Sequence, residues 1–138
     1  MIDKINVRVY AICLKDRKIL SLFEYYAGGK LTKLPGGGLE FGEGIIDCLK
    51  REMKEELNLK ISNIEHFYTQ EDFLVSKFRN NEQLLTIYYK VKIDNEQELR
   101  IMDESIQNVE WISLDSENPF PLPIDHLVFE KLKKENNL

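Results

Sequence analysis

The sequence has few of the residues that cross-link a chain or anchor it in a membrane. Cysteine occurs only at Cys13 and Cys48 among 138 residues, which gives neither a disulfide framework nor a paired metal motif. No apolar run approaches the roughly 18 residues of a membrane span, and the first ten residues lack the apolar segment of a signal peptide. These absences argue against a disulfide-rich or membrane protein, and we expect a reduced cytoplasmic setting.

A surplus of positive charge is also missing. The chain has 19 Lys and Arg residues against 24 Asp and Glu residues, a net charge of −5. An acidic protein is poorly suited to gripping a DNA or RNA backbone, but it can hold a small phosphorylated molecule through a local site or a metal. The length and a hydrophobic content of 43% suit one globular domain, expected to span residues 1–138.

Glycine is absent from most of the chain. All seven glycines lie between Gly28 and Gly44. Because glycine supplies positive φ angles and close approach of the backbone, this window is predicted to be a specialised loop. The sequence that follows predicts a helix over residues 44–57.

The remaining pattern is rich in strands. Runs of β-branched and aromatic residues predict strands over residues 5–14, 19–26, 64–68, 73–78, 84–93 and 109–114. The first two are expected to form a hairpin, whereas segment 71–83 is compatible with either a hairpin or a substrate loop. Three prolines between 119 and 123 predict a stiff loop before a second helix over 124–134. Strands with two helices indicate a mixed α/β layer fold.

The central helix gathers three carboxylates. At about 100° per residue, Glu52, Glu55 and Glu56 share one arc at the edge of an apolar stripe. Like charges one turn apart destabilise a helix slightly, and a divalent cation would reverse that effect. Hard oxygen ligands suit Mg²⁺ or Mn²⁺. The alternative is a solvated acidic face on which Arg51 makes ordinary surface pairs.

The loop and the helix together resemble the Nudix box over residues 37–59. The matching positions are Gly37, Glu43, Arg51, Glu52, Met53, Glu55, Glu56 and Leu59, which are eight of the nine in the pattern. The exception is Asn58, where the family usually has glycine. That position is expected to be the left-handed C-cap of the helix, where asparagine is the next-best residue. We therefore expect Asn58 to cost about a few tenths of a kcal/mol relative to glycine.

The resemblance implies a Nudix-type α/β/α sandwich with a mixed β-sheet. It also implies Mg²⁺-dependent (or Mn²⁺-dependent) hydrolysis of a diphosphate linkage in a soluble nucleoside diphosphate derivative, of the nucleoside triphosphate, ADP-ribose or nucleotide-sugar type. In such chemistry the metal neutralises phosphate charge and acidifies a bound water, which leaves little covalent work for the protein.

Residue roles follow from the resemblance by position. Glu52, Glu55 and Glu56 would be metal ligands, and Glu52 is the first candidate for the general base. The carbonyl of Gly36 is a further candidate ligand. Arg51 and Glu43 are expected to pair and tie the loop to the helix, although a change at Arg51 could still abolish activity.

One more acid is implied for the metal site. In some family members, an acid in the loop before the Trp-containing strand completes the site. Glu104 fits this place and Asp103 is next, and the alternative for both is a solvated loop residue.

Substrate-binding residues are less clear from the sequence. Tyr25 and Tyr26 could stack on a base or be ordinary strand residues. Asp125 lies where some mutator-type members recognise a purine, and packing or capping of the last helix is the alternative. Nothing in the sequence selects among the basic residues that might hold phosphates, which are Arg8, Lys30, Lys33 and Arg79.

A different class of function remains open, because a Nudix fold can serve as a nucleotide sensor without catalysis. Such sensors often lose box carboxylates and usually carry a DNA-binding domain, whereas this sequence keeps every box carboxylate. The expected partner is a small nucleotide rather than a DNA or RNA polymer or a membrane. A homodimer is compatible with the resemblance.

Overall fold

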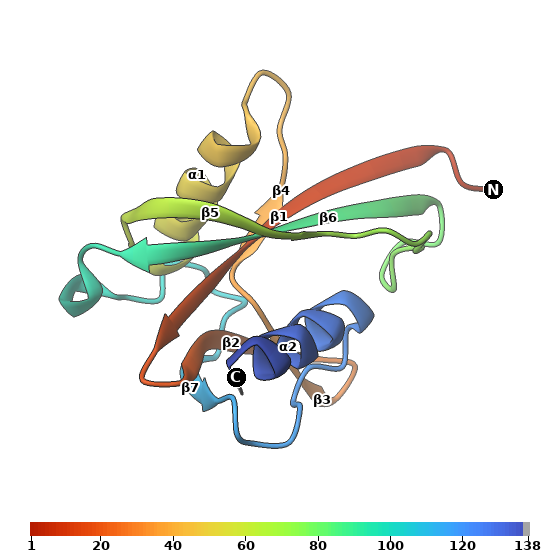
Figure 1. Ribbon diagram of the computed structural model, residues 1–138. Coiled ribbons are helices and arrows are strands. Elements are labelled where there is room, and N and C mark those ends of the chain that lie inside the picture. Colours follow the sequence, from red (N-terminus) through yellow and green to blue (C-terminus); the bar gives the residue numbers. More distant parts are fainter. Residues whose placement is uncertain (137–138) are drawn as a thin grey trace.

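The computed structural model describes residues 1–136 as a seven-stranded mixed sheet with helices on both sides (Figure 1). The elements are β1 (Lys4–Lys15), β2 (Lys18–Tyr26), β3 (Gly29–Lys33), β4 (Gly36–Gly38), α1 (Ile45–Leu57), β5 (Ile61–Thr69), β6 (Glu82–Ile93), the 3₁₀ turn η1 (Glu96–Glu98), β7 (Asn108–Ser113) and α2 (Pro123–Asn136). The strand order is β3-β2-β1-β6-β5, while β4 pairs with β1 and β7 with β2. Within residues 1–136, β1 and β6 are the one pair of strands that runs in parallel, which confirms the predicted mixed sheet.

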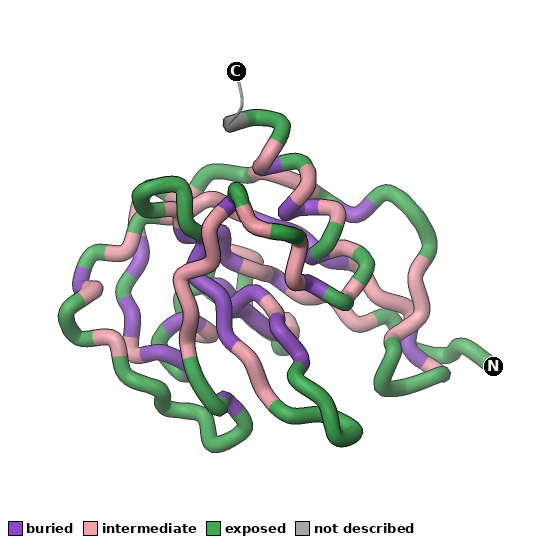
Figure 2. The backbone as a smooth tube through the Cα atoms, turned by 90° about the horizontal axis from the view of Figure 1, so that it is seen from below, coloured by how far each residue is buried: buried purple, intermediate pink, exposed green. Residues whose placement is uncertain are grey.

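Alternation along β1 builds two apolar layers, one on each face of the sheet. Val9, Ala11 and Cys13 pack in one cluster with Leu49 and other buried residues of α1. The residues between them face the opposite way, into a second cluster that includes Phe129 and Leu132 of α2. Figure 2 shows the buried stretches along the strands, with exposed loops outside. The two layers make the predicted α/β/α sandwich.

The predicted hairpin between β1 and β2 is confirmed, but it is short. The two strands pair only at Leu14↔Ile19 and Lys15↔Lys18, around a turn in which Asp16 and Arg17 have φ of 51° and 59°. Beyond the tip, β1 pairs with β6 and β4 while β2 pairs with β3 and β7. The strands therefore diverge, and both contribute residues to the lining of a cleft.

The glycine window is not the single loop that the sequence predicts, because β3 and β4 lie within it. At Gly36, φ is +146° and an added Cβ would lie 2.1 Å from the carbonyl oxygen of Val9. A bare glycine backbone is what allows β4 to lie against β1. The glycines that allow this close approach thus also form strand β4, although glycine has a low propensity for strands.

The strand predicted over 73–78 is wrong. This segment makes one isolated bridge, Val75↔Gln83, and then turns where the Ser76 hydroxyl accepts hydrogen bonds from the N–H groups of Phe78 and Arg79 at 3.1 and 3.2 Å. Backbone hydrogen bonds from Ser76 N–H to Glu82 and from Leu84 N–H to Leu74 give the segment a hairpin-like pairing with the start of β6. The segment also lines the cleft, and a role as a substrate loop stays a prediction. The other predicted strands and both helices are present within a few residues of their expected bounds. Among residues 1–136, no helix is both long and apolar enough to cross a membrane.

Candidate functional site

Helix α1 presents its carboxylates beside the glycines of β4. The helix begins after Gly44 and ends at Asn58, which is left-handed with φ 60° and ψ 32° and donates its backbone N–H to the carbonyl of Lys54. This confirms the predicted C-cap. The Asn58 side chain also donates to the carbonyl of Glu98 at 3.1 Å, so asparagine supplies a tie to η1 that glycine would lack.

Arg51 links the loop to the acids of α1. Its Nε and Nη2 donate to the two oxygens of Glu43 at 3.0 and 2.7 Å, which confirms the predicted pair. Its Nη1 donates to Glu52 at 2.9 Å and to Glu55 at 3.0 Å, and Nη2 also reaches the carbonyl of Gly38 at 2.9 Å. The hydrogen bond from Arg51 lowers the pKa of Glu43 to about 2. One guanidinium thus holds three carboxylates in place.

Glu56 is the buried acid of the group. Its carboxylate is 7% exposed and accepts a hydrogen bond from the backbone N–H of Gly36 at 2.9 Å. Burial raises the pKa of Glu56 to about 7, against the opposing effect of that hydrogen bond, and the charge of Glu52 raises it further. Burial also raises the pKa of the partly buried Glu52, although Arg51 opposes this effect. Glu55 is exposed.

The backbone at Gly37 lies directly against Glu52. A Cβ at Gly37 would come within 2.4 Å of Cδ of Glu52 and 2.5 Å of both its carboxylate oxygens. The backbone of Gly36 therefore lies next to Glu56, and the backbone of Gly37 lies next to Glu52. The glycine-rich strand and the acidic helix form one constellation, which we call the acid cluster (Glu52, Glu55 and Glu56).

The donor chemistry of the acid cluster fits a hard divalent cation. The cluster offers carboxylate oxygens, and burial disfavours the ionised forms of Glu52 and Glu56, which a cation would favour. Within residues 1–136, however, no three such side chains are already gathered as a metal-binding group. Arg51 donates hydrogen bonds to the carboxylates of Glu52 and Glu55, and the N–H of Gly36 donates one to Glu56. A bound cation would therefore compete with Arg51.

The loop before β7 brings one acid toward the cluster. The charge of Asp103 is among the influences that raise the pKa of Glu56. The Asp103 carboxylate accepts hydrogen bonds from the backbone and hydroxyl of Ser105 at 2.9 and 2.8 Å, which lower its own pKa. Glu104 is its exposed neighbour. The loop is tied to α1 where the N–H of Met102 donates to the carbonyl of Glu56.

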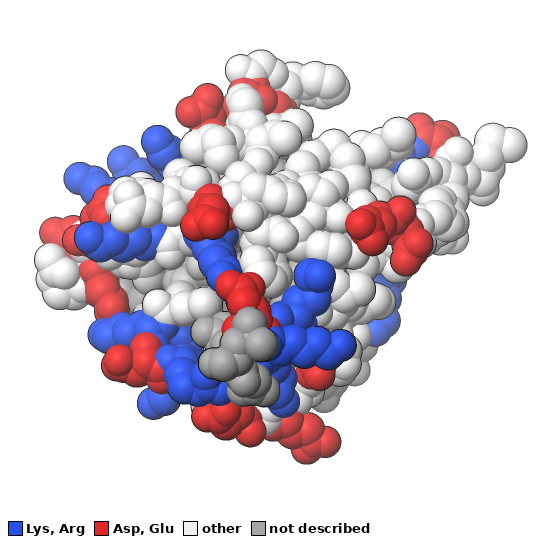
Figure 3. Space-filling view, in the orientation of Figure 1, with Lys and Arg blue, Asp and Glu red and all other residues white. Residues whose placement is uncertain are grey.

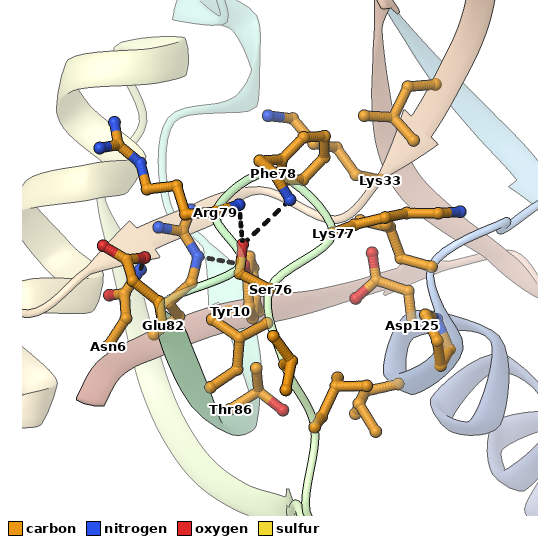
Figure 4. A pocket seen from close by; sticks show the side chains of 18 of the residues that line it. Asn6, Tyr10, Lys33, Ser76, Lys77, Phe78, Arg79, Glu82, Thr86 and Asp125 are labelled. Atoms are coloured by element: carbon orange, nitrogen blue, oxygen red, sulfur yellow. Dashed lines mark hydrogen bonds between the residues drawn. The ribbon is translucent and has the colours of Figure 1, made fainter. Parts of the chain in front are cut away.

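A cleft of about 420 Å³ is lined by Arg8 and Lys33, whose charges interact with those of the acid cluster. Figure 4 shows this cleft. Its walls come from β1, β2, β3, β6, the 74–79 loop and the start of α2. Asp125 of α2 is buried in one wall, where it accepts hydrogen bonds from the hydroxyl of Tyr88 at 2.5 Å and the N–H of Leu34 at 3.3 Å. Burial raises the pKa of Asp125 to about 6. The residue both packs α2 and lines the cleft.

The two candidate tyrosines are separated by strand alternation. Tyr26 lines the cleft and sets its ring against that of Phe78, with centroids 4.8 Å apart. Tyr25 packs against Phe23 and is 67% exposed, and it is not among the cleft residues of the described chain. Phe78 was not singled out from the sequence, because only the tertiary fold brings its loop to β2.

The structure also separates the basic candidates. Arg8, Lys33 and Arg79 line the cleft. Lys30 instead pairs with Glu110 at 2.8 Å and lies over the ring of Phe23. Lys77, which the sequence did not single out, lines the cleft from the 74–79 loop.

Comparisons with known proteins agree with this architecture. Residues 4–131 match the family model described as NUDIX domain. The nucleoside triphosphatase NudI of Enterobacter sp. (strain 638) is 29% identical over 93 residues, which cover 64% of this chain and 66% of that protein. The match therefore spans slightly less than two thirds of that relative.

Two solved structures show the same fold. A MutT NUDIX hydrolase from Burkholderia pseudomallei superposes with a TM-score of 0.77 at 20% identity, covering 93% of this chain and 98% of that one. The ORF135 protein of E. coli gives a TM-score of 0.78 at 22% identity, covering 96% and 91%. The match over residues 4–131, together with the box geometry, shows that the chain belongs to the NUDIX domain family and has the fold of its MutT-like members.

Proposed function

We propose that this chain, as a single domain, is a Mg²⁺-dependent pyrophosphohydrolase that cleaves a diphosphate linkage in a soluble nucleotide, with nucleoside triphosphates as the first substrate class. The observation that carries the proposal is the acid cluster on α1, whose charges act on Arg8, a residue of a cleft with aromatic and basic walls. The aromatic wall at Tyr26 and Phe78 suits a base, and the basic residues suit phosphates. The relative whose name specifies a nucleoside triphosphatase supports this class.

The proposed roles of the acids follow from their surroundings. Glu52, Glu55 and Glu56 would hold the divalent cation, with the carbonyl of Gly36 as a further ligand. Asp103 is a better-supported additional acid than Glu104, because its charge acts on Glu56. The cation, when bound, supplies charge neutralisation and acidifies a water. Mn²⁺ has the same preference for oxygen ligands and could replace Mg²⁺.

The reaction is an attack of water on one phosphorus of the diphosphate. A bond forms between the water oxygen and that phosphorus, and the bond to the bridging oxygen breaks. Glu52 is the proposed base that takes the proton from water, since it is partly buried and lies against the backbone of Gly37. The products from a triphosphate are a nucleoside monophosphate and pyrophosphate.

Asp125 and Tyr26 are the proposed base-binding residues. Asp125 has its two oxygens engaged by Tyr88 and Leu34, so it is held rigidly in the wall. A small nucleotide fits the cleft better than a polymer. On the face in Figure 3, basic and acidic side chains intermingle, and large areas are uncharged.

The test is product release from a substrate panel with Mg²⁺. The panel holds canonical and 8-oxo nucleoside triphosphates, ADP-ribose, nucleotide sugars and dinucleoside polyphosphates. We expect one class to be cleaved, and Glu52→Gln to be slower by at least 10²-fold, as for loss of a general base. Glu65→Gln, an exposed acid on β5, is the matched control.

The second candidate is a nucleotide sensor that binds without turnover. It would be favoured if no panel member is cleaved while one of them raises the melting temperature. If Glu52→Gln cleaves as fast as the unmodified chain, the proposed catalytic face is wrong.

A further inference from the structure

Arg8 stands between the acid cluster and the cleft. It pairs with Gly38 in the register of β1 and β4, and its Nη1 lies 3.6 Å from where a Cβ on Gly38 would sit. The neighbouring glycine, Gly37, lies against Glu52. Arg8 also lines the cleft. Because neighbouring strand residues point to opposite faces, Arg8 and Glu52 lie on opposite faces of β4, close enough for the charges of Glu52 and Glu56 to act on Arg8.

The guanidinium of Arg8 is partly buried but only partly satisfied. Its Nε donates to the hydroxyl of Tyr10 at 2.6 Å. Within residues 1–136, neither terminal nitrogen has a hydrogen-bond partner, whereas Arg51 uses all three of its nitrogens. Among the described residues no buried side-chain nitrogen lacks a partner, so both terminal nitrogens of Arg8 are open to solvent and available to an anion. Two parallel N–H donors match the oxygens of a phosphate.

The orientation of Arg8 is fixed through two tyrosines. Its Cζ lies 5.7 Å from the centre of the Tyr10 ring, as well as hydrogen-bonding to that residue. The Tyr10 ring stacks on that of Tyr88 with centroids 5.2 Å apart, and Tyr88 donates to Asp125. A row of side chains in contact thus runs along the cleft from Arg8 through Tyr10 and Tyr88 to Asp125.

We propose that Arg8 is a substrate-binding residue that grips the phosphate on the cleft side of the scissile diphosphate linkage, and that Tyr10 is its positioning residue. The inference rests on the proposed function for the identity of the substrate. Lys33 does not have the same freedom, because its Nζ pairs with Glu24 at 3.2 Å. Arg8 would therefore set which phosphate faces the acid cluster, and hence where the chain of phosphates is cut.

The alternative role for Arg8 is that of a counter-charge. The charges of Glu52 and Glu56 contribute to the pKa of Arg8: burial lowers that pKa, but Tyr10 and then these two acids outweigh the effect and raise it. A counter-charge alone would change the melting temperature or the Mg²⁺ requirement. It would not make binding depend on the number of phosphates in the ligand.

The experiment measures binding and turnover separately. Binding of inorganic pyrophosphate and of nucleoside triphosphates with a non-hydrolysable α,β-methylene linkage is measured by calorimetry at one Mg²⁺ concentration, for the unmodified chain, Arg8→Gln, Arg8→Lys and Tyr10→Phe. Lys92→Gln, which removes an exposed charge from β6, is the control. We expect Arg8→Gln to weaken pyrophosphate and triphosphate binding by about 10- to 100-fold, the usual effect of a hydrogen bond to a charged group, with affinity for the unphosphorylated nucleoside unchanged.

Three further readouts separate binding from folding. In turnover, the loss should appear in KM and leave kcat within about threefold, as for uniform binding of ground and transition states. Affinity should fall less steeply with added KCl in Arg8→Gln than in the unmodified chain. Arg8→Lys and Tyr10→Phe should give intermediate losses, because each keeps one part of the arrangement and both preserve the ring stack.

The outcomes are distinct from those of the hydrolysis test. If Arg8→Gln binds pyrophosphate and triphosphates within twofold of the unmodified chain, the proposal is overturned. It is also overturned if the unmodified chain binds neither ligand. If the chain binds them with the expected loss in Arg8→Gln but cleaves nothing, the proposed hydrolysis fails and the role of Arg8 in binding stands.

Discussion

The backbone of Gly37 and the carboxylate of Glu52 are in such close contact that a methyl group on Gly37 would lie 2.4 Å from Cδ of Glu52. The atoms in the way are the far end of a flexible side chain, so the side chain can move and the backbone need not. Gly36 is different, because an added Cβ would meet the backbone of Val9 at 2.1 Å. Gly37 is therefore needed for the position of the Glu52 carboxylate, whereas Gly36 is needed for the fold.

Gly37→Ala should abolish activity while leaving the fold intact. The methyl group displaces the carboxylate of Glu52, and we expect kcat/KM to fall by at least 10²-fold with a stability loss below about 1 kcal/mol. Gly36→Ala should instead lower the melting temperature sharply, since both its φ and its contact with β1 require glycine. Thermal unfolding and hydrolysis, measured on both variants, check the contrast. Full activity in Gly37→Ala would show that the position of Glu52 does not matter.

Glu56→Gln should stabilise the metal-free protein at alkaline pH. The pKa of Glu56 is raised from 4.5 to about 7, so the folded state binds its proton more tightly than the unfolded chain does. Its contribution is fully present below pH 4.5 and is lost as the pH rises through about 7, a change of roughly 3 kcal/mol. A neutral glutamine can still accept the hydrogen bond of Gly36.

The measurement is urea unfolding in a chelator between pH 4.5 and 8. The unmodified chain should lose stability over this range more steeply than Glu56→Gln, although Asp125 adds a similar slope to both, up to about pH 6. The same substitution should remove Mg²⁺-dependent activity. Identical pH slopes for the two proteins would contradict the raised pKa of Glu56.

Glu43→Gln should increase the demand for Mg²⁺. Arg51 divides its donors between Glu43 on one side and Glu52 and Glu55 on the other. Without the charge of Glu43, Arg51 is freer to engage the other two acids and competes more strongly with a cation. We expect the Mg²⁺ concentration for half-maximal activity to rise by about 2- to 5-fold, the range of a solvent-exposed ion pair. Lys54→Gln, on the outer face of α1, should leave it unchanged.

The sequence was most informative where one segment carries the whole pattern. The Nudix box lies within 23 contiguous residues, so helical geometry places Glu52, Glu55 and Glu56 on one arc, and the resemblance implied the pair of Arg51 with Glu43. The left-handed C-cap at Asn58 is equally local, because it depends on the residue that follows the last helical turn. Such features follow from spacing and need no knowledge of the tertiary fold.

The cleft could not be predicted from local spacing, because it depends on contacts between distant segments. Segment 74–79 has the composition of a strand, but the hydroxyl of Ser76 turns it and brings Phe78 beside Tyr26. The row of side chains from Arg8 to Asp125 joins β1, β6 and α2, and the rings that stack within it, Tyr10 and Tyr88, are far apart in the sequence. Because neighbouring residues of a strand point to opposite faces, Tyr26 lines the cleft and Tyr25 does not.

Asp103 and Glu104 allow a last test, of which loop acid serves the metal. The charge of Asp103 acts on Glu56, and its hydrogen bonds from Ser105 lower its own pKa, so it is ionised and oriented at neutral pH. Asp103→Asn should therefore raise the Mg²⁺ concentration for half-maximal activity several-fold, and Glu104→Gln should have the smaller effect. Isothermal titration of Mn²⁺ into each variant measures the metal directly, without relying on turnover. A larger effect at Glu104 would restore the assignment that position in the sequence favoured, and would mean that the loop moves when the cation binds.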